Sequence, residues 1–197
     1  MQGVTDGNAA ALTDLKPEIL WQHFGALCNI PRGTYNEMEV QGYIMNIAAQ
    51  YGLVAQQDKA GNIVVVVPAS VGNEDTPSVC LQAHLDMVCV KASTSTHDFK
   101  KDAIELVSDG DWLKTKGTTM GGDNGIGAAA LLTFMTEQIE HGPLECLFTA
   151  SEEDGFIGAK KLAPGFIQSR RIINLDSEEE GIIYVGSAGG GRIKGLF

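Results

Sequence analysis

Apolar residues recur along this chain at two spacings, which predict alternating helices and strands. After Pro17, the residues Leu20, Phe24 and Leu27 lie three or four positions apart, as on one face of a helix. The same spacing returns later in the chain and predicts helices over residues 17–29, 36–51, 125–139 and 158–162. Asn36 is the candidate N-cap of the second helix.

Short apolar runs bounded by glycine or polar residues predict the strands. They occupy residues 53–57, 63–67, 79–81, 144–150, 172–175 and 182–185. The turn Ala60-Gly61-Asn62 joins the first two as an antiparallel hairpin, whereas the later strands alternate with helices, as parallel strands do. The sequence therefore predicts an α/β domain with a mixed sheet over residues 17–197. Residues 1–16 predict a loosely held polar tail in front of it.

Composition and charge exclude several classes of partner. The chain has 197 residues, 44% of them hydrophobic, which suffices for one domain with a single core. Its formal net charge of −11 repels phosphate backbones, so nucleic acid is not an expected partner. No apolar run approaches the roughly 18 residues of a membrane span, and no secretory signal begins the sequence. We expect a cytoplasmic protein, with Cys28, Cys80 and Cys146 as reduced thiols among apolar neighbours.

Acidic and imidazole side chains cluster where several of these runs end. In chain order they are His84 with Asp86, Asp123, Glu152 with Glu153, and Asp176. His84 and Asp86 are two residues apart on extended backbone, so both side chains point to the same face. In an α/β sheet, ligands gather outside the carboxyl ends of the strands, where loops bring distant residues together. The four clusters therefore predict a metal site.

Each cluster taken alone has an ordinary structural explanation. The pair at 84 and 86 matches common surface polarity, and Asp123 could be an N-cap in a glycine-rich turn. Glu152 and Glu153 continue into Asp154 as a solvated acidic turn would, and the glutamates at 178–180 are typical of a solvated loop. Only the recurrence of such clusters at four comparable places favours the metal site.

Other catalytic motifs do not fit the sequence. The glycines around Asp123 match neither GxGxxG nor the phosphate loop with its lysine, and Val185 replaces the first glycine of GxSxG around Ser187. His23 and His141 are predicted to be a helix-face and a loop histidine, not ligands. Carboxylates combined with imidazole suit zinc, manganese or cobalt, whereas histidine is a poor calcium ligand and the EF-hand spacing is absent.

Four motifs in this order resemble the M20 family of dinuclear zinc peptidases. They are Gln82-Ala83-His84-Leu85-Asp86-Met87-Val88, Gly121-Gly122-Asp123-Asn124-Gly125-Ile126-Gly127, Ser151-Glu152-Glu153-Asp154-Gly155 and Asn174-Leu175-Asp176-Ser177-Glu178. His97-Asp98-Phe99 and the early Ile30-Pro31-Arg32 are most similar to the aminoacyl-histidine dipeptidase (Xaa-His dipeptidase) branch. The resemblance runs from about Pro17 to the last residue. It implies a three-layer α/β/α fold with a mixed, mostly parallel sheet.

The resemblance also implies a role for each cluster. His84, Asp123, Glu153 and Asp176 would hold two divalent metal ions, most commonly zinc with manganese or cobalt as alternatives, and Asp123 would bridge them. Asp86 would support His84, and Glu152 would be the general base. The implied reaction is hydrolysis of Xaa-His-type dipeptides by metal-activated water, with Glu152 passing the proton to the leaving amine.

The family pattern extends beyond this chain. Its members are longer, with a lid and dimerisation domain inserted in the catalytic domain and a further ligand histidine near the C-terminus. No histidine follows His141 here, so the chain is expected to be the N-terminal portion of a homodimeric enzyme. The alternative is a metal-binding or interaction module of the same fold that lacks the catalytic activity.

Overall fold

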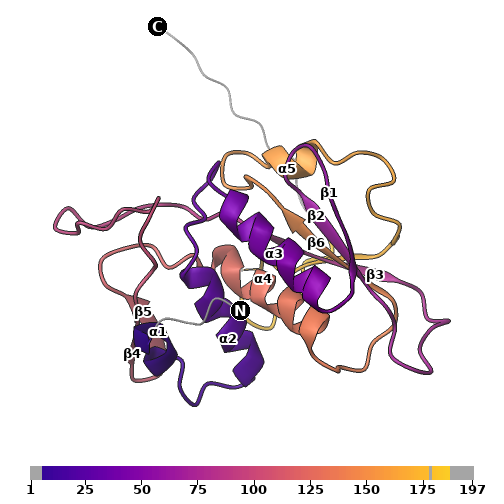
Figure 1. Cartoon of the computed structure of the whole chain (residues 1–197), viewed down its shortest axis with the longest axis horizontal. Coiled ribbons are helices and arrows are strands. Elements are labelled where there is room, and N and C mark those ends of the chain that lie inside the picture. The colour runs from indigo at the N-terminus through magenta and orange to yellow at the C-terminus, as the bar shows by residue number, and fades with distance from the viewer. Residues whose placement is uncertain (1–5, 178, 187–197) are drawn as a thin grey trace, which may run out of the picture.

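A computed structural model describes residues 6–177 and 179–186 of the chain, and its elements follow an α/β order (Figure 1). The helices are α1 (Asp6–Ala11), α2 (Glu18–Cys28), α3 (Met38–Gln50), α4 (Gly122–Thr136) and α5 (Ile157–Lys160). The strands are β1 (Val54–Gln57), β2 (Ile63–Val67), β3 (Val79–His84), β4 (Leu106–Asp109), β5 (Trp112–Thr115), β6 (Leu144–Thr149) and β7 (Ile172–Asn174). The expected helices and most of the expected strands are present, with bounds shifted by a few residues.

The main sheet is mixed, as predicted, and has the strand order β1-β2-β6-β3-β7. Strands β1, β2 and β6 pair antiparallel, while β3 runs parallel to both β6 and β7. The expectation of a mostly parallel sheet is therefore met in the half formed by β6, β3 and β7, whose strands are joined by crossovers. On that half, the carboxyl ends of β3, β6 and β7 meet at one edge of the sheet.

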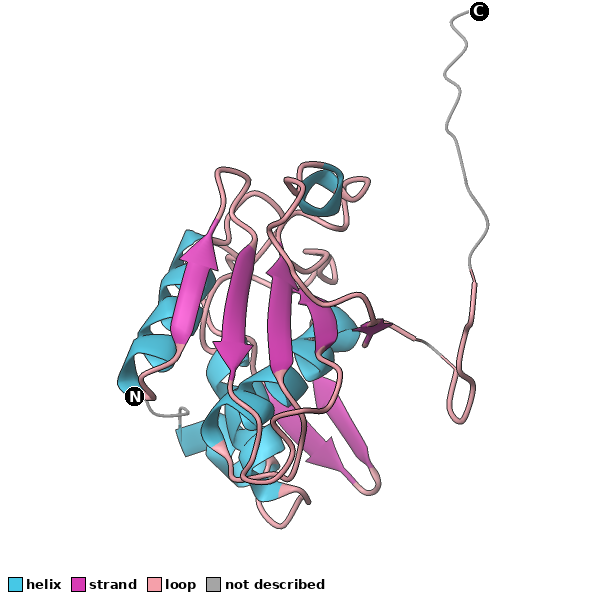
Figure 2. Cartoon of the chain, turned by 90° about the vertical axis from the view of Figure 1, so that its right-hand side faces the viewer, coloured by secondary structure: helices cyan, strands magenta, loops and turns pink. Residues whose placement is uncertain are grey.

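Helices cover the two faces of the sheet unequally (Figure 2). The larger core lies under α2, α3 and α4, where Phe24, Ile44 and Leu131 pack against strand residues such as Val65 and Phe148. The opposite face has a smaller core of Val64, Cys80 and Leu147, covered by Leu162, Phe166 and Ile167 from the segment after α5. The three layers are present, although the third consists mainly of an irregular segment.

The tail predicted for the first sixteen residues is corrected in part. Residues 6–11 form helix α1, and its Asn8 is buried. The Asn8 amide donates to the carbonyl of Ile104 and accepts from the amide N–H of Leu106. These bonds tie α1 to β4, so this segment is anchored by a polar side chain that hydrophobic periodicity does not reveal.

Two further expectations differ from the structure, and one hairpin is additional to those expected. Glu37, not Asn36, precedes the first turn of α3, and no side chain caps that helix. Residues 182–185 form no strand in the described part of the chain, and Ile183 and Val185 are almost fully exposed. The antiparallel hairpin of β4 and β5 was not predicted. None of the helices formed by the described residues is both long and apolar enough to cross a membrane.

Candidate metal centre

His84 is the last residue of β3 and the centre of the candidate site. Its side chain is 1% exposed. The ring Nε2 faces three carboxylates, at 2.8 Å from Asp123 Oδ1, 3.7 Å from Asp176 Oδ2 and 3.9 Å from Glu152 Oε2. The other nitrogen, Nδ1, lies 3.3 Å from Asp86 Oδ1 but has no partner with hydrogen-bond geometry among the described residues. Three strand ends and one helix start thus converge on a single imidazole.

Asp86 connects the end of β3 to the turn after β6. Its carboxylate is completely buried. It accepts hydrogen bonds from the amide N–H of Glu152 at 2.8 Å, the amide N–H of Glu153 at 3.2 Å and the hydroxyl of Thr34 at 2.9 Å. Burial by itself raises the pKa of Asp86, but contact with His84 and these donors outweigh it and lower the pKa. Asp86 is therefore ionised at neutral pH and fixes the backbone of both glutamates.

The turn that carries Glu152 and Glu153 has a second support from α3. Ser151 adopts a left-handed conformation with φ 48°, which needs local stabilisation. The buried carboxylate of Glu37 accepts both the amide N–H and the hydroxyl of Ser151 at 2.8 Å. The backbone of Glu152 and Glu153 is consequently held by Asp86, and that of the preceding Ser151 by Glu37.

Asp123 and Asp176 are the two carboxylates that lie nearest to His84 Nε2. Asp123 lies at the start of α4 in a non-helical conformation, after Gly121 with φ 71°. The adjacent Asn124 is 3% exposed, and its amide donates to the carbonyl of Leu175 and to the Asp176 carboxylate. Asn124 therefore links the first turn of α4 to the segment that follows β7, and Asp123 and Asp176 come together.

The donors form two groups that share His84. One group contains His84, Glu152 and Glu153, and the other contains His84, Asp123 and Asp176; within each, the donor atoms lie within 4.8 Å of one another. Bonds of about 2.0–2.1 Å in a tetrahedral zinc site place neighbouring donors roughly 3.3 Å apart. The separations of 2.8 to 3.9 Å around His84 Nε2 bracket that value. The donor set is thus compatible with divalent metal ions.

The crowded carboxylates change the protonation of the whole cluster. Burial, followed by the neighbouring negative charges, raises the pKa of Glu152 and of Glu153. Burial is also the main cause that raises the pKa of Asp176. Burial would lower the pKa of His84, but Asp86, Asp123 and Asp176 outweigh it and raise the pKa to about 9. No lysine or arginine of the described residues forms an ion pair with these carboxylates, so a bound cation would relieve their repulsion.

The structure brings all six candidate residues together and leaves the other histidines outside. His23 is buried in α2, with its Nε2 2.9 Å from the hydroxyl of Thr136, and burial lowers its pKa to about 4. His141 lies in the loop before β6, with Nδ1 2.6 Å from the carbonyl oxygen of Gly142. The supporting residues Thr34 and Glu37 were not predicted from the sequence. No sequence signal marks them, because each acts on a segment far away in the sequence: Thr34 donates to Asp86, and Glu37 accepts two hydrogen bonds from Ser151.

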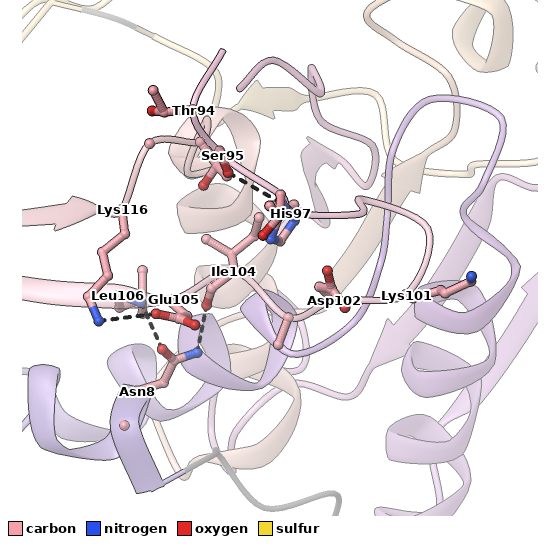
Figure 3. Close-up of a pocket in the computed structure, with 15 residues that line it drawn as sticks. Asn8, Thr94, Ser95, His97, Lys101, Asp102, Ile104, Glu105, Leu106 and Lys116 are labelled. Carbon is pink, nitrogen blue, oxygen red and sulfur yellow. Dashed lines mark hydrogen bonds and ion pairs between the residues drawn. The ribbon is translucent and has the colours of Figure 1, made fainter. Parts of the chain in front are cut away.

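Two of the surface hollows on the described part of the chain contain a candidate residue; one of them, of about 910 Å³, is lined by Asp176 and by residues of β7. The other, of about 400 Å³, adjoins Glu153 and is lined by apolar surfaces that include Tyr35, Val88 and Phe99. A further hollow, of about 1030 Å³, contains none of the candidate residues. Figure 3 shows that most of the labelled residues in its wall are polar and that Lys116 faces Glu105. The two side chains form an ion pair at 3.2 Å. The candidate metal donors therefore lie outside this hollow.

The fold and the paired donor groups together define an α/β domain of the metallohydrolase type. No family model matches the chain. The cytosol non-specific dipeptidase of Escherichia coli is 47% identical over 180 residues, which are 91% of this chain and 37% of that protein. The crystal structure of aminoacylhistidine dipeptidase from Vibrio alginolyticus superposes with a TM-score of 0.84 at 41% identity, over 86% of this chain and 35% of that one.

A more distant structure shares the fold alone. A tripeptidase from Staphylococcus aureus superposes with a TM-score of 0.67 at 23% identity, over 82% of this chain and 44% of that one. The similarity to the two dipeptidases and the order of the four motifs show that the chain belongs to the M20 family of metallopeptidases. The chain spans little more than a third of the length of those two dipeptidases.

Proposed function

We propose that this chain forms the N-terminal portion of the catalytic domain of a metal-dependent dipeptidase that acts on small peptides. The observation that carries the proposal is the convergence of two donor groups on His84 at the carboxyl ends of β3, β6 and β7. The names of the two dipeptidase relatives support the reaction class. The hollow beside Glu153 has room for a substrate side chain close to the proposed metal centre.

Four residues are proposed as ligands of two divalent ions. His84 and Asp176 would hold one ion, Glu153 the other, and Asp123 both. Asp123 suits the shared position because its side chain is 62% exposed and reaches His84 Nε2 at 2.8 Å. Zinc is the proposed metal, with manganese or cobalt as alternatives, since imidazole and carboxylate donors suit all three.

Glu152 is the proposed general base and Asp86 its support. Bound divalent ions would polarise the scissile carbonyl and lower the pKa of the attacking water. The raised pKa of Glu152 suits a group that accepts a proton from water and returns it to the leaving amine. Asp86 holds the Glu152 amide and lies beside His84 Nδ1, so it would orient both the base and one metal ligand.

Four finer features belong to the same proposal. Aminoacyl-histidine dipeptides are the proposed substrates, in line with the name of the Vibrio protein. A cytoplasmic location agrees with the name of the Escherichia coli relative. A homodimer and a separate lid domain would be formed by sequence outside this chain. The second candidate function is a metal-binding or interaction module without catalysis, which is favoured by the small share of the relatives that the chain covers.

A chimera tests the catalytic proposal. The 180 aligned residues of this chain would replace their counterpart in the Escherichia coli dipeptidase, which supplies the rest of the protein. We expect the chimera to hydrolyse Xaa-His dipeptides, and Glu152→Gln to lower kcat by about 100-fold or more with its zinc content unchanged. Glu39→Gln, on the exposed face of α3, is the matched control and should leave kcat unchanged.

The outcomes separate the two candidate functions. A folded, zinc-loaded chimera without peptidase activity would favour the binding module. Unchanged turnover in Glu152→Gln would contradict the role of Glu152 as the base. Equal kcat/KM values for Xaa-His and Xaa-Gly dipeptides would remove the proposed substrate preference and leave the reaction class intact.

A further inference from the structure

Arg32 is a buried cation directly beneath the candidate metal centre. It lies between α2 and α3 and is 2% exposed. Its guanidinium donates to the carbonyl oxygen of Leu85 at 3.0 Å, to that of Asp86 at 3.4 Å and to that of Gly121 at 2.5 Å. Its own carbonyl accepts the amide N–H of Met87 at 3.0 Å. One side chain therefore joins the segment of His84 and Asp86 to the loop of Asp123.

Two glycines beside Asp123 provide the space for this guanidinium. A Cβ at Gly121 would lie 2.5 Å from Arg32 Nη2, and a Cβ at Gly125 would lie 2.6 Å from the same atom. Both distances are shorter than any side chain allows without displacement. At Gly122, between them, a Cβ would meet nothing within 4 Å. The close approach of Arg32 thus disfavours a side chain at both glycines, and at Gly121 the φ of 71° disfavours one as well.

The bonding of Arg32 is unusual for a buried arginine. None of the ion pairs recorded for the described residues includes it, and its Nε has no hydrogen-bond partner there. Buried charges are ordinarily paired with an opposite charge, because an isolated one is costly. The charge of Arg32 interacts with the carboxylates of Asp86 and Asp123 by Coulomb attraction alone. The hydrogen bonds of its planar guanidinium go to backbone carbonyls. Its partners are backbone atoms whose positions determine where the donor side chains point.

We infer that Arg32 is a positioning residue that holds the Asp123 loop against the end of β3, so that Asp123 and His84 face the same metal ion. This inference rests on the proposed metal centre. The opposite side of the loop is held by Asn124, which donates to the carbonyl of Leu175. A lysine would keep the charge but could not span three carbonyls, since it lacks the planar fork. The role therefore depends on the geometry of arginine as well as on its charge.

Hydrogen exchange of the metal-free chain tests the positioning directly. In Arg32→Lys, amide exchange over residues 119–127 should accelerate by about tenfold or more at pH 7. Glu145→Gln is the matched control, because Glu145 is a buried acid that accepts the amides of Gln168 and Ser169 at the other end of β6. This control should accelerate exchange around 168–169 and leave 119–127 unchanged. Equal exchange of 119–127 in both variants would overturn the inference.

Cobalt binding followed by absorption spectroscopy gives the second readout. Loss of a group that orients metal ligands typically lowers affinity by about 10- to 100-fold, and we expect that range for Arg32→Lys. Gly125→Ala should behave like Arg32→Lys, whereas Gly122→Ala should bind cobalt within about twofold of the wild type. If Arg32→Lys does not fold, the comparison of Gly125→Ala with Gly122→Ala provides the test instead. Equal affinities in Gly125→Ala and Gly122→Ala would contradict the positioning role.

The two readouts distinguish a failure of the proposed metal centre from a failure of the proposed role of Arg32. If the unaltered chain binds no cobalt, the proposed metal centre fails in this chain, while the exchange of 119–127 still decides whether Arg32 holds the loop. If cobalt binds equally well to the unaltered chain and to Arg32→Lys, the metal centre stands and the role of Arg32 is refuted.

Discussion

Replacing Asp86 by asparagine should both destabilise the metal-free chain and damage the metal centre. The Asp86 carboxylate has one oxygen that accepts the Glu152 amide and another that accepts the Glu153 amide and the Thr34 hydroxyl. In Asp86→Asn, one of these oxygens becomes an NH₂ group that faces a donor. Hydrogen bonds to a charged acceptor contribute about 1.5–3 kcal/mol each, so a loss of about 3 kcal/mol is expected.

Urea unfolding of the metal-free chain at pH 7 measures this loss. Glu145→Gln is again the control, since it removes a buried carboxylate with comparable backbone bonds away from the site. It should lose a similar free energy of unfolding and keep its cobalt affinity, whereas Asp86→Asn should lose both. A change below about 0.5 kcal/mol in Asp86→Asn would refute the assignment of Asp86 as the organiser of the turn.

Three further predictions concern pH, packing and thiol reactivity. Because the pKa of His84 is raised from 6.5 to about 9, its contribution to the stability of the metal-free chain is complete below pH 6.5 and is lost as the pH rises through 9. That contribution is about 3 kcal/mol at most. Urea titrations at pH 6 and pH 9 measure how much of it is lost, and His84→Asn should abolish it. Asn62, fully buried, bonds to Asp58, Gly158 and Ala150, so Asn62→Ala should cost about 2–3 kcal/mol in thermal unfolding, and an unchanged Tm would contradict this. A thiol reagent should label only Cys89 in the native chain and all four cysteines after unfolding, since the other three are buried with pKa values raised to about 12; rapid labelling of a second thiol would contradict the packing.

Much of the fold could be predicted from hydrophobic periodicity. Helices α2, α3 and α4 and strands β2 and β6 each bury an apolar stripe or run, so their residues carry a strong local signal. Helix α1 and the hairpin of β4 and β5 could not be predicted in this way. Their association depends on the Asn8 side chain and on Leu12 and Leu106, which are buried by contacts far apart in the sequence.

Residues 182–185 show that the composition of a strand does not by itself produce a strand. The four residues, Ile182 to Val185, have the composition of a strand, yet a strand exists only where a neighbour supplies hydrogen bonds. In the described structure they lie exposed beside β7, and Ile172 and Ile173 of that strand are also half exposed. The apolar pattern of residues 182–185 is typical of a strand, but the local sequence does not determine which segment would pair with them.

The sequence indicated the candidate donors and their support Asp86, but not the further supports Thr34 and Glu37. His84, Asp123, Glu152 and Asp176 were recognisable because each follows an apolar run or lies among glycines, and the structure brings them within a few ångströms. Arg32 could be noticed only as part of a family resemblance. Its role follows from three carbonyl contacts and from the space left by Gly121 and Gly125, which only the folded chain displays.

The most direct test of the metal centre is elemental analysis of the purified chain after loading with zinc or manganese. Asp123→Ala is the control, because the Asp123 side chain is 62% exposed and its removal should remove a ligand without unfolding the domain. The proposed centre predicts two ions per chain, and their loss in Asp123→Ala. An ion content of zero, or one that Asp123→Ala leaves unchanged, would contradict the centre.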